Sequence, residues 1–170
     1  MKKLAGLSIA LAILAVIIGV IVFYPRTTEK PVQSSVNGAQ TQEPLNADKI
    51  FQLVNQERIK AGVPPLIRDA ELDKSAQSKA DDMAINNYFD HISPLTGKHG
   101  YEYIPYRKCL QSGENIFWLK YNSVTEDDNK EVVTGWLESK PHHDALLNPN
   151  LNYAGLGQKN SKTVMHFCQM

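Results

Sequence analysis

The residues best suited to acid–base or metal chemistry are five histidines and a few carboxylates. The histidines are His91, His99, His142, His143 and His166. A neutral imidazole can bind zinc or copper, and a nearby glutamate such as Glu114 can add a ligand or act as a base. The chain contains no H-E-x-x-H pair, no G-x-S-x-G, no P-loop and no G-x-G-x-x-G. The standard zinc-peptidase, serine-esterase, ATP and NAD interpretations therefore lack support in the sequence.

Several short phrases carry most of these residues in a fixed order. An opening phrase contains LVN at 53–55 with Arg58, Gly62 and Leu66. The later phrases are FDHISP at 89–94, GENI at 113–116, WLESKPHH at 136–143 with LLNPN at 146–150, and GLG at 155–157 with HFCQ at 166–169. One phrase alone would be weak, but five phrases in this order are specific.

In this order the phrases resemble the bacterial members of the CAP superfamily. That superfamily comprises cysteine-rich secretory proteins, antigen 5 and pathogenesis-related 1, and its domains are also called SCP-like. The resemblance covers about residues 48–170. It implies an α+β fold, a three-layer α-β-α sandwich, with a cleft on its surface.

The resemblance also implies a cleft with a His-Glu-Glu-His tetrad. His91 matches the first histidine and Glu114 matches the first glutamate. Ser139 occupies the position of the second glutamate, and Glu138 precedes it by one residue. Since one residue rotates a helical side chain by about 100°, Glu138 need not face the cleft. The last histidine matches His166 in the animal and plant pattern or His142 in the bacterial one, so the tetrad is incomplete.

Each of these residues also has a structural interpretation. His91 and Glu114 can hydrogen-bond each other and cross-link the layers, or His91 and His166 can hold a zinc or copper ion with an open coordination position. His142 is expected to lock a helix-to-loop turn more readily than to ligate. The other polar groups, His99, His143 and the Asp81–Asp82 pair, are expected to be solvated. Ser93 lacks the base and orienting group that a nucleophile needs.

Cys109 and Cys168 form a candidate disulfide. Two cysteines in a domain outside the cytoplasm favour a bridge. The resemblance places both segments in the region of the central sheet, which makes the bridge plausible. The alternative is a pair of buried free thiols that pack as small apolar groups.

The N-terminal 24 residues are predicted to form one transmembrane signal-anchor helix. Residues 4–24 carry no charge, and as a helix they would span roughly 30 Å, the thickness of the bilayer hydrocarbon. A cleaved signal peptide is the alternative, but its apolar region is usually only about 7–15 residues and ends at small residues. This run ends in Phe23-Tyr24-Pro25-Arg26. Lys2 and Lys3 favour a cytoplasmic N-terminus, but Arg26 and Lys30 stand on the other flank. We expect the rest of the chain to lie outside the cytoplasm.

Composition divides the remainder into a linker and a domain. Residues 25–46 are rich in Pro, Ser, Thr and Gln, which predicts a disordered linker; an ordered arm packed on the domain is the alternative. Residues 47–170 are long enough for one core. Apolar spacing predicts helices over 47–61, 69–86 and 125–139, with Asn46 and Asp69 as N-caps. Strands are expected near 115–119, 153–158 and 163–170.

These observations favour a membrane-anchored, extracytoplasmic CAP-domain protein. We expect a binding module, more than an enzyme, whose cleft takes a small apolar, peptide or cell-envelope ligand. The first alternative is a metal-assisted hydrolase that uses His91, His166 and Glu114 with zinc or copper. The second is a structural or adhesive surface protein. Nucleic acid is not an expected partner, because the 18 basic and 18 acidic residues give a formal net charge of zero.

Overall fold

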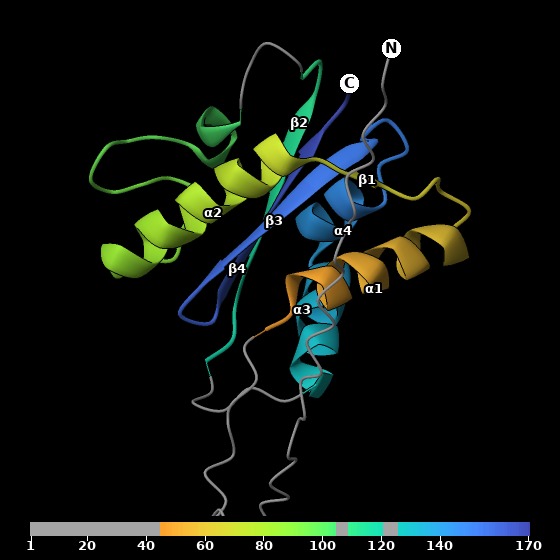
Figure 1. Ribbon diagram of the computed structural model, residues 1–170, viewed down its shortest axis with the longest axis horizontal. Helices are drawn as coiled ribbons and strands as arrows, with labels where there is room; N and C mark the ends of the chain where they lie inside the picture. Colours follow the sequence, from red (N-terminus) through yellow and green to blue (C-terminus); the bar gives the residue numbers. More distant parts are fainter. Residues whose placement is uncertain (1–44, 105–108, 121–125) are drawn as a thin grey trace, which may run out of the picture. The chain divides into compact units, whose positions relative to one another are not determined.

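The computed structural model describes residues 45–104, 109–120 and 126–170 (Figure 1). Four α-helices, one 3-10 helix and four strands follow one another in this part of the chain. They are α1 (Ala47–Lys60), β1 (Ile67–Arg68), α2 (Ala70–Ile85), η1 (Gly100–Tyr103), β2 (Ser112–Trp118), α3 (Glu126–Glu138), α4 (Lys140–Leu146), β3 (Tyr153–Lys159) and β4 (Lys162–Cys168).

The strands form one sheet in the order β1-β3-β4-β2. β3 and β4 are an antiparallel hairpin, and β2 runs antiparallel to β4 with Glu114 directly opposite His166. β1 pairs in parallel with β3. Among the described strands, β2 is therefore an edge of the sheet, and its residue Glu114 shares a face with His166.

Helices cover both faces of this sheet, with α2 on one side and α1, α3 and α4 on the other (Figure 1). These are the three α-β-α layers that the resemblance implies. α2 approaches β3 closely because two glycines face it: a Cβ on Gly155 or Gly157 would lie 2.1 Å from the backbone nitrogen of Asp73 or Gln77. The buried stripe of α2 consists of Leu72, Ala76, Ala80 and Met83, as predicted.

The opposite layer packs around Trp136 of α3, which is fully buried with Val132 beside it. A buried arginine also stabilises this layer through hydrogen bonds. The guanidinium of Arg58, on α1, donates to four backbone carbonyls, those of Pro64, Leu146, Asn148 and Leu151. It thereby joins α1 to the segment between α4 and β3, and no carboxylate of the described residues pairs with it.

The predicted helix starts are confirmed by their caps. The side chain of Asn46 accepts from the N–H of Lys49, and that of Asp69 accepts from the N–H groups of Glu71 and Leu72. Three elements were not predicted, namely β1, η1 and α4. Each has seven residues or fewer, too few to display a hydrophobic period.

The predicted transmembrane helix at 1–24 lies outside the described residues, as does the predicted linker up to residue 44. Within the described ranges, no helix is long and apolar enough to cross a bilayer. Leu45 is buried and Asn46 caps α1, so the ordered domain includes these two residues.

Candidate functional site

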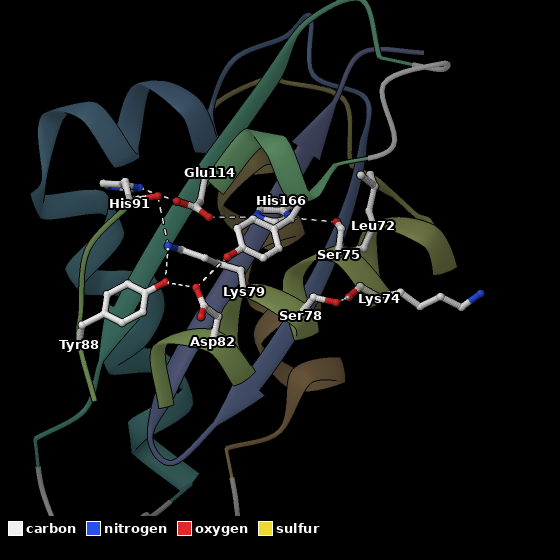
Figure 2. A network of polar contacts seen from close by, with 11 residues as sticks. Leu72, Lys74, Ser75, Ser78, Lys79, Asp82, Tyr88, His91, Glu114 and His166 are labelled. Atoms are coloured by element: carbon white, nitrogen blue, oxygen red, sulfur yellow. Dashed lines mark hydrogen bonds and ion pairs between the residues drawn. The ribbon is translucent and has the colours of Figure 1, made fainter. Parts of the chain in front are cut away.

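Glu114 lies between two histidines on the α2 face of the sheet (Figure 2). Its Oε1 is 2.6 Å from Nδ1 of His91, and its Oε2 is 2.9 Å from Nε2 of His166. The other ring nitrogen of His166, Nδ1, lies 2.8 Å from the hydroxyl of Ser75. The structure thus brings together three of the four cleft residues suggested by the sequence.

Several elements position this cluster. Strands β2 and β4 place Glu114 and His166 in register, α2 supplies Ser75, and the loop after α2 supplies His91. Gly100 at the start of η1 leaves the space that the carboxylate fills, since a Cβ there would lie 2.0 Å from Oε2 of Glu114. The glycine is therefore required by the site and not by its backbone angles.

The cluster holds Glu114 in its ionised form. Burial alone would raise the pKa of this carboxyl, whose side chain is only 6% exposed. Hydrogen bonds from His166 and His91 outweigh burial and hold the pKa below its usual value. Both carboxylate oxygens are occupied by these bonds.

A buried lysine anchors the loop that carries His91 (Figure 2). The ammonium of Lys79, on α2, donates to the His91 carbonyl and to the Tyr88 hydroxyl, each at 3.1 Å. Tyr88 donates in turn to Asp82, and Tyr103 donates to the same carboxylate oxygen at 2.7 Å. Asp82, expected to be solvated, is half-buried and accepts hydrogen bonds from Tyr88 and from Tyr103 of η1.

Burial and hydrogen bonding shift the pKa values of several groups in this network. Burial and the hydrogen bond to Asp82 raise the pKa of Tyr88 to about 12. Burial opposes ionisation of Asp82, but hydrogen bonds from Tyr88 and Tyr103 lower its pKa on balance. Burial lowers the pKa of Lys79, while the charges of Glu114 and Asp82 oppose that shift.

His142 stands beside the cluster without joining its hydrogen bonds. Its ring centroid is 5.7 Å from that of His91. Burial, then the neighbouring His91, lowers the pKa of His142, so the ring is neutral at pH 7. The residue lies in the first turn of α4, where its carbonyl accepts from the Asn115 side chain at 3.0 Å. Glu138 is exposed, consistent with the one-residue offset.

The predicted metal ligands are already engaged with protein partners. Both nitrogens of His166 and both oxygens of Glu114 take part in hydrogen bonds. No group of three or more His, Cys, Asp or Glu side chains in the described ranges is placed to hold an ion. With these contacts His91 and His166 do not fit as joint ligands, because His166 has no free nitrogen. A metal ion held by both His91 and His166 stays a prediction, and it would require these hydrogen bonds to rearrange.

Two adjoining pockets follow the edge strand β2, and together we name them the edge groove. The polar pocket has a volume of about 240 Å³, and the apolar pocket has about 530 Å³. They are neighbours, because the ring of His91, which lines the first, is 5.7 Å from the ring of His142, which lines the second. The polar pocket is also lined by His99, Gly100, Tyr101, Ser112, Gly113 and Glu114. The apolar pocket is also lined by Phe89, Ile116, Phe117, Trp118, Lys120, Gly135, Trp136 and Ser139.

Sequence reasoning missed several residues of this site. Ser75 and Lys79 lie on the buried face of α2 between apolar positions, and a charged residue on such a stripe is a detectable signal. His99, expected to be solvated, instead lines the polar pocket and stacks on Tyr101 at 5.1 Å between ring centroids. No pattern in the chain predicts that contact, because it depends on the path of a loop.

Cys109 and Cys168 are joined in a disulfide, with Cα atoms 5.3 Å apart. The bridge ties the segment before β2 to the end of β4. It therefore closes a loop that contains Glu114, His142 and His166.

Known proteins share this sequence pattern and fold. The chain is 33% identical over 146 residues to the uncharacterized protein YkwD of Bacillus subtilis, which covers 82% of this chain and 52% of that protein. It is 36% identical over 113 residues to the uncharacterized membrane protein YlbC of the same organism, which covers 64% of this chain and 30% of that protein. The chain thus spans about half of the first relative's length and less than a third of the second's.

Among solved structures, an extracellular protein with an SCP domain from Bacillus anthracis matches with a TM-score of 0.62. That match has 27% sequence identity and covers 73% of this chain and 40% of the other. The family model of CAP, the cysteine-rich secretory protein family, matches residues 51–170. This match includes every residue of the edge groove, and the chain therefore belongs to the CAP family.

Proposed function

We propose that this chain is a membrane-tethered, extracytoplasmic binding module whose edge groove takes a ligand with an apolar body. The observation that carries this proposal is the apolar pocket of about 530 Å³, which adjoins a smaller polar pocket at the His91–His142 pair. Ligand sites commonly have such volumes and combine apolar walls with a few polar groups. The ligand would place its apolar part among the aromatic side chains and its polar part near His91.

The hydrogen bonds of the histidine cluster support binding more than hydrolysis. A hydrolase would use Glu114 to activate water, but both of its oxygens are bound to imidazole nitrogens. The same bonds connect the His91 loop to β2 and β4. In this proposal the cluster shapes the rim of the groove and does not react.

The proposed location rests on the uncharged N-terminal segment and on the relatives. One relative is named as a membrane protein, and one solved neighbour is named as extracellular. A disulfide also suits a compartment outside the cytoplasm. We expect protease added to intact cells to digest the domain, and a domain protected until the cells are lysed would contradict this location.

The binding proposal can be tested through tryptophan fluorescence. The chain has two tryptophans, and both line the apolar pocket. The full chain in lipid nanodiscs would be titrated with short peptides, acyl compounds and cell-wall fragments, and each ligand would be checked afterwards for cleavage. We expect a saturable change in emission with the ligand intact. Cleavage that is lost in Glu114→Gln would instead indicate the hydrolase, and the absence of any saturable response would leave the structural or adhesive interpretation.

A further inference from the structure

Strand β2 presents backbone hydrogen-bonding groups to the edge groove. The N–H of Leu119 donates to the carbonyl of Ser161, the position opposite it in the register of β4. Because backbone bonds in an antiparallel pair fall on alternate residues, Asn115 and Phe117 also face β4. The backbone groups of Glu114, Ile116 and Trp118 therefore point away from β4, toward the open edge.

One of these outward groups already has a partner. The indole N–H of Trp136 donates to the Ile116 carbonyl at 3.0 Å. This bond occupies the Ile116 carbonyl in the middle of the edge, whereas Glu114 in the polar pocket and Trp118 in the apolar pocket have no such bond from a described side chain to their outward carbonyls. An incoming strand would thus pair at two places, one on each side of Ile116.

Two lysines make the Trp118 end of the groove cationic. The ammonium groups of Lys120 and Lys162 lie 5.5 and 5.1 Å from the Trp118 ring centroid. Lys162 is only 5% exposed, and neither lysine forms an ion pair with a residue that the structure describes. Two neighbouring ammonium groups without a carboxylate partner in the described part of the chain repel each other, and a bound anion would offset that repulsion.

From these contacts we propose that the edge groove binds an extended acidic peptide, which pairs with the free edge of β2 and places a carboxylate near Lys120 and Lys162. This inference rests on the proposed function and narrows its ligand. An apolar side chain of the peptide occupies the apolar pocket beside Phe89 and Trp118, whose rings are 5.8 Å apart. The ionised Glu114 repels an anion at the other end of the groove. The carboxylate of the peptide is therefore expected at the lysine end.

A hydrocarbon ligand satisfies only part of this surface. An acyl chain can fill the apolar pocket, but it cannot hydrogen-bond the outward backbone groups of Glu114 and Trp118. A peptide in extended form supplies N–H and C=O groups at the strand period, and binding by strand addition uses such an edge. The open backbone and the two lysines therefore favour a peptide over a lipid.

The test measures binding of a fluorescein-labelled octapeptide, with leucine and tyrosine at its centre and two glutamates, to the full chain in phosphatidylcholine nanodiscs. Fluorescence anisotropy gives Kd, with empty nanodiscs as the blank. We expect Lys120→Glu to weaken binding about tenfold or more, since it reverses an unpaired charge at the groove. The matched control is Lys74→Glu, which makes the same charge change at an exposed position outside both pockets and should leave Kd unchanged.

Two altered peptides separate charge from backbone pairing. Replacing both glutamates with lysines, or methylating alternate backbone nitrogens, should each weaken binding at least tenfold. Equal affinity for the acidic and basic peptides, or for the methylated one, would overturn the proposal. Saturable binding of dodecanoate without binding of the acidic peptide would also overturn it, yet it would leave the proposed binding function intact.

Discussion

The carboxylate of Glu114 determines how the histidine cluster responds to acid. Its pKa is lowered in the folded protein, so the folded state binds fewer protons than the unfolded chain in acidic solution. The resulting stabilisation is complete above the ordinary glutamate pKa of about 4.3 and is lost as the pH falls through the lower folded value. Glu114→Gln should therefore show a smaller decrease in the free energy of unfolding than the wild type between about pH 5 and pH 3.

Urea unfolding across this pH range provides the measurement. The control is Glu138→Gln, which changes an exposed glutamate outside the cluster and should follow the wild-type curve. Parallel curves for wild type and Glu114→Gln would show that the cluster does not depend on the ionised carboxylate.

Lys79 is predicted to matter for the position of His91 as well as for stability. Lys79→Met keeps the length of the side chain but removes the donor to the His91 carbonyl and the Tyr88 hydroxyl. A lost hydrogen bond to a charged group costs about 2 kcal/mol of unfolding free energy. Hydrogen exchange at residues 88–92 should rise together with this loss.

The matched control is Lys74→Met on the same helix, where the lysine is exposed and its ammonium pairs with Glu71. It should change the unfolding free energy by less than about 0.5 kcal/mol. Equal losses of unfolding free energy in the two variants, with unchanged hydrogen exchange at residues 88–92, would show that Lys79 does not position the His91 loop.

The sequence indicates which residues belong to the cluster around Glu114, but it does not indicate all the contacts that they make. His91, Glu114 and His166 could be selected from the family phrases, and the register of two strands then brings Glu114 and His166 together. The roles of Ser75 and Lys79 depend on how α2 rotates over the sheet. That rotation is set by packing against Gly155 and Gly157, which no local pattern in α2 reveals.

At the scale of elements, the contact between α2 and β3 is expected to tolerate no added methyl group. A Cβ on Gly157 would lie 2.1 Å from the backbone nitrogen of Gln77, and backbone cannot move aside without shifting the helix. Gly157→Ala should lower the free energy of unfolding by about 3 kcal/mol, because overpacking of this kind strains the whole layer.

Gly113→Ala offers the comparison, because a Cβ there would meet its nearest neighbour at an ordinary 3.5 Å. We expect a change below about 1 kcal/mol in thermal or urea unfolding. A similar cost in the two variants would mean that the loss does not come from the close approach of α2, since a Gly→Ala change by itself lowers the entropy of the unfolded chain and favours folding.

The longer elements could be predicted because their signals are local. α1 and α2 begin at polar caps and carry apolar residues at helical spacing, and both were placed to within about one residue. The helix α4 was missed, since seven residues starting beside Pro141 show no period of their own. It forms because Leu146 packs into the core and Arg58 binds the carbonyl that ends it.

At the scale of the whole molecule, the disulfide holds together the strands that build the groove. Cys109 and Cys168 are separated by 59 residues, a loop that includes β2, α3, α4 and most of the hairpin. In the chain-entropy account, closing such a loop stabilises the fold by about 4 kcal/mol. The doubly substituted Cys109→Ala/Cys168→Ala chain should lose stability of this order.

This last expectation has a direct check. Thiol titration of the unfolded, unreduced wild type should find no reactive cysteine, and unfolding in reducing agent should bring the wild type close to the double variant. Because β2 is an edge strand that pairs only with β4 within the described sheet, the variant should also show faster hydrogen exchange in β2 than in β3. Two reactive thiols, or exchange that rises equally in both strands, would mean that the edge of the groove is held by packing alone.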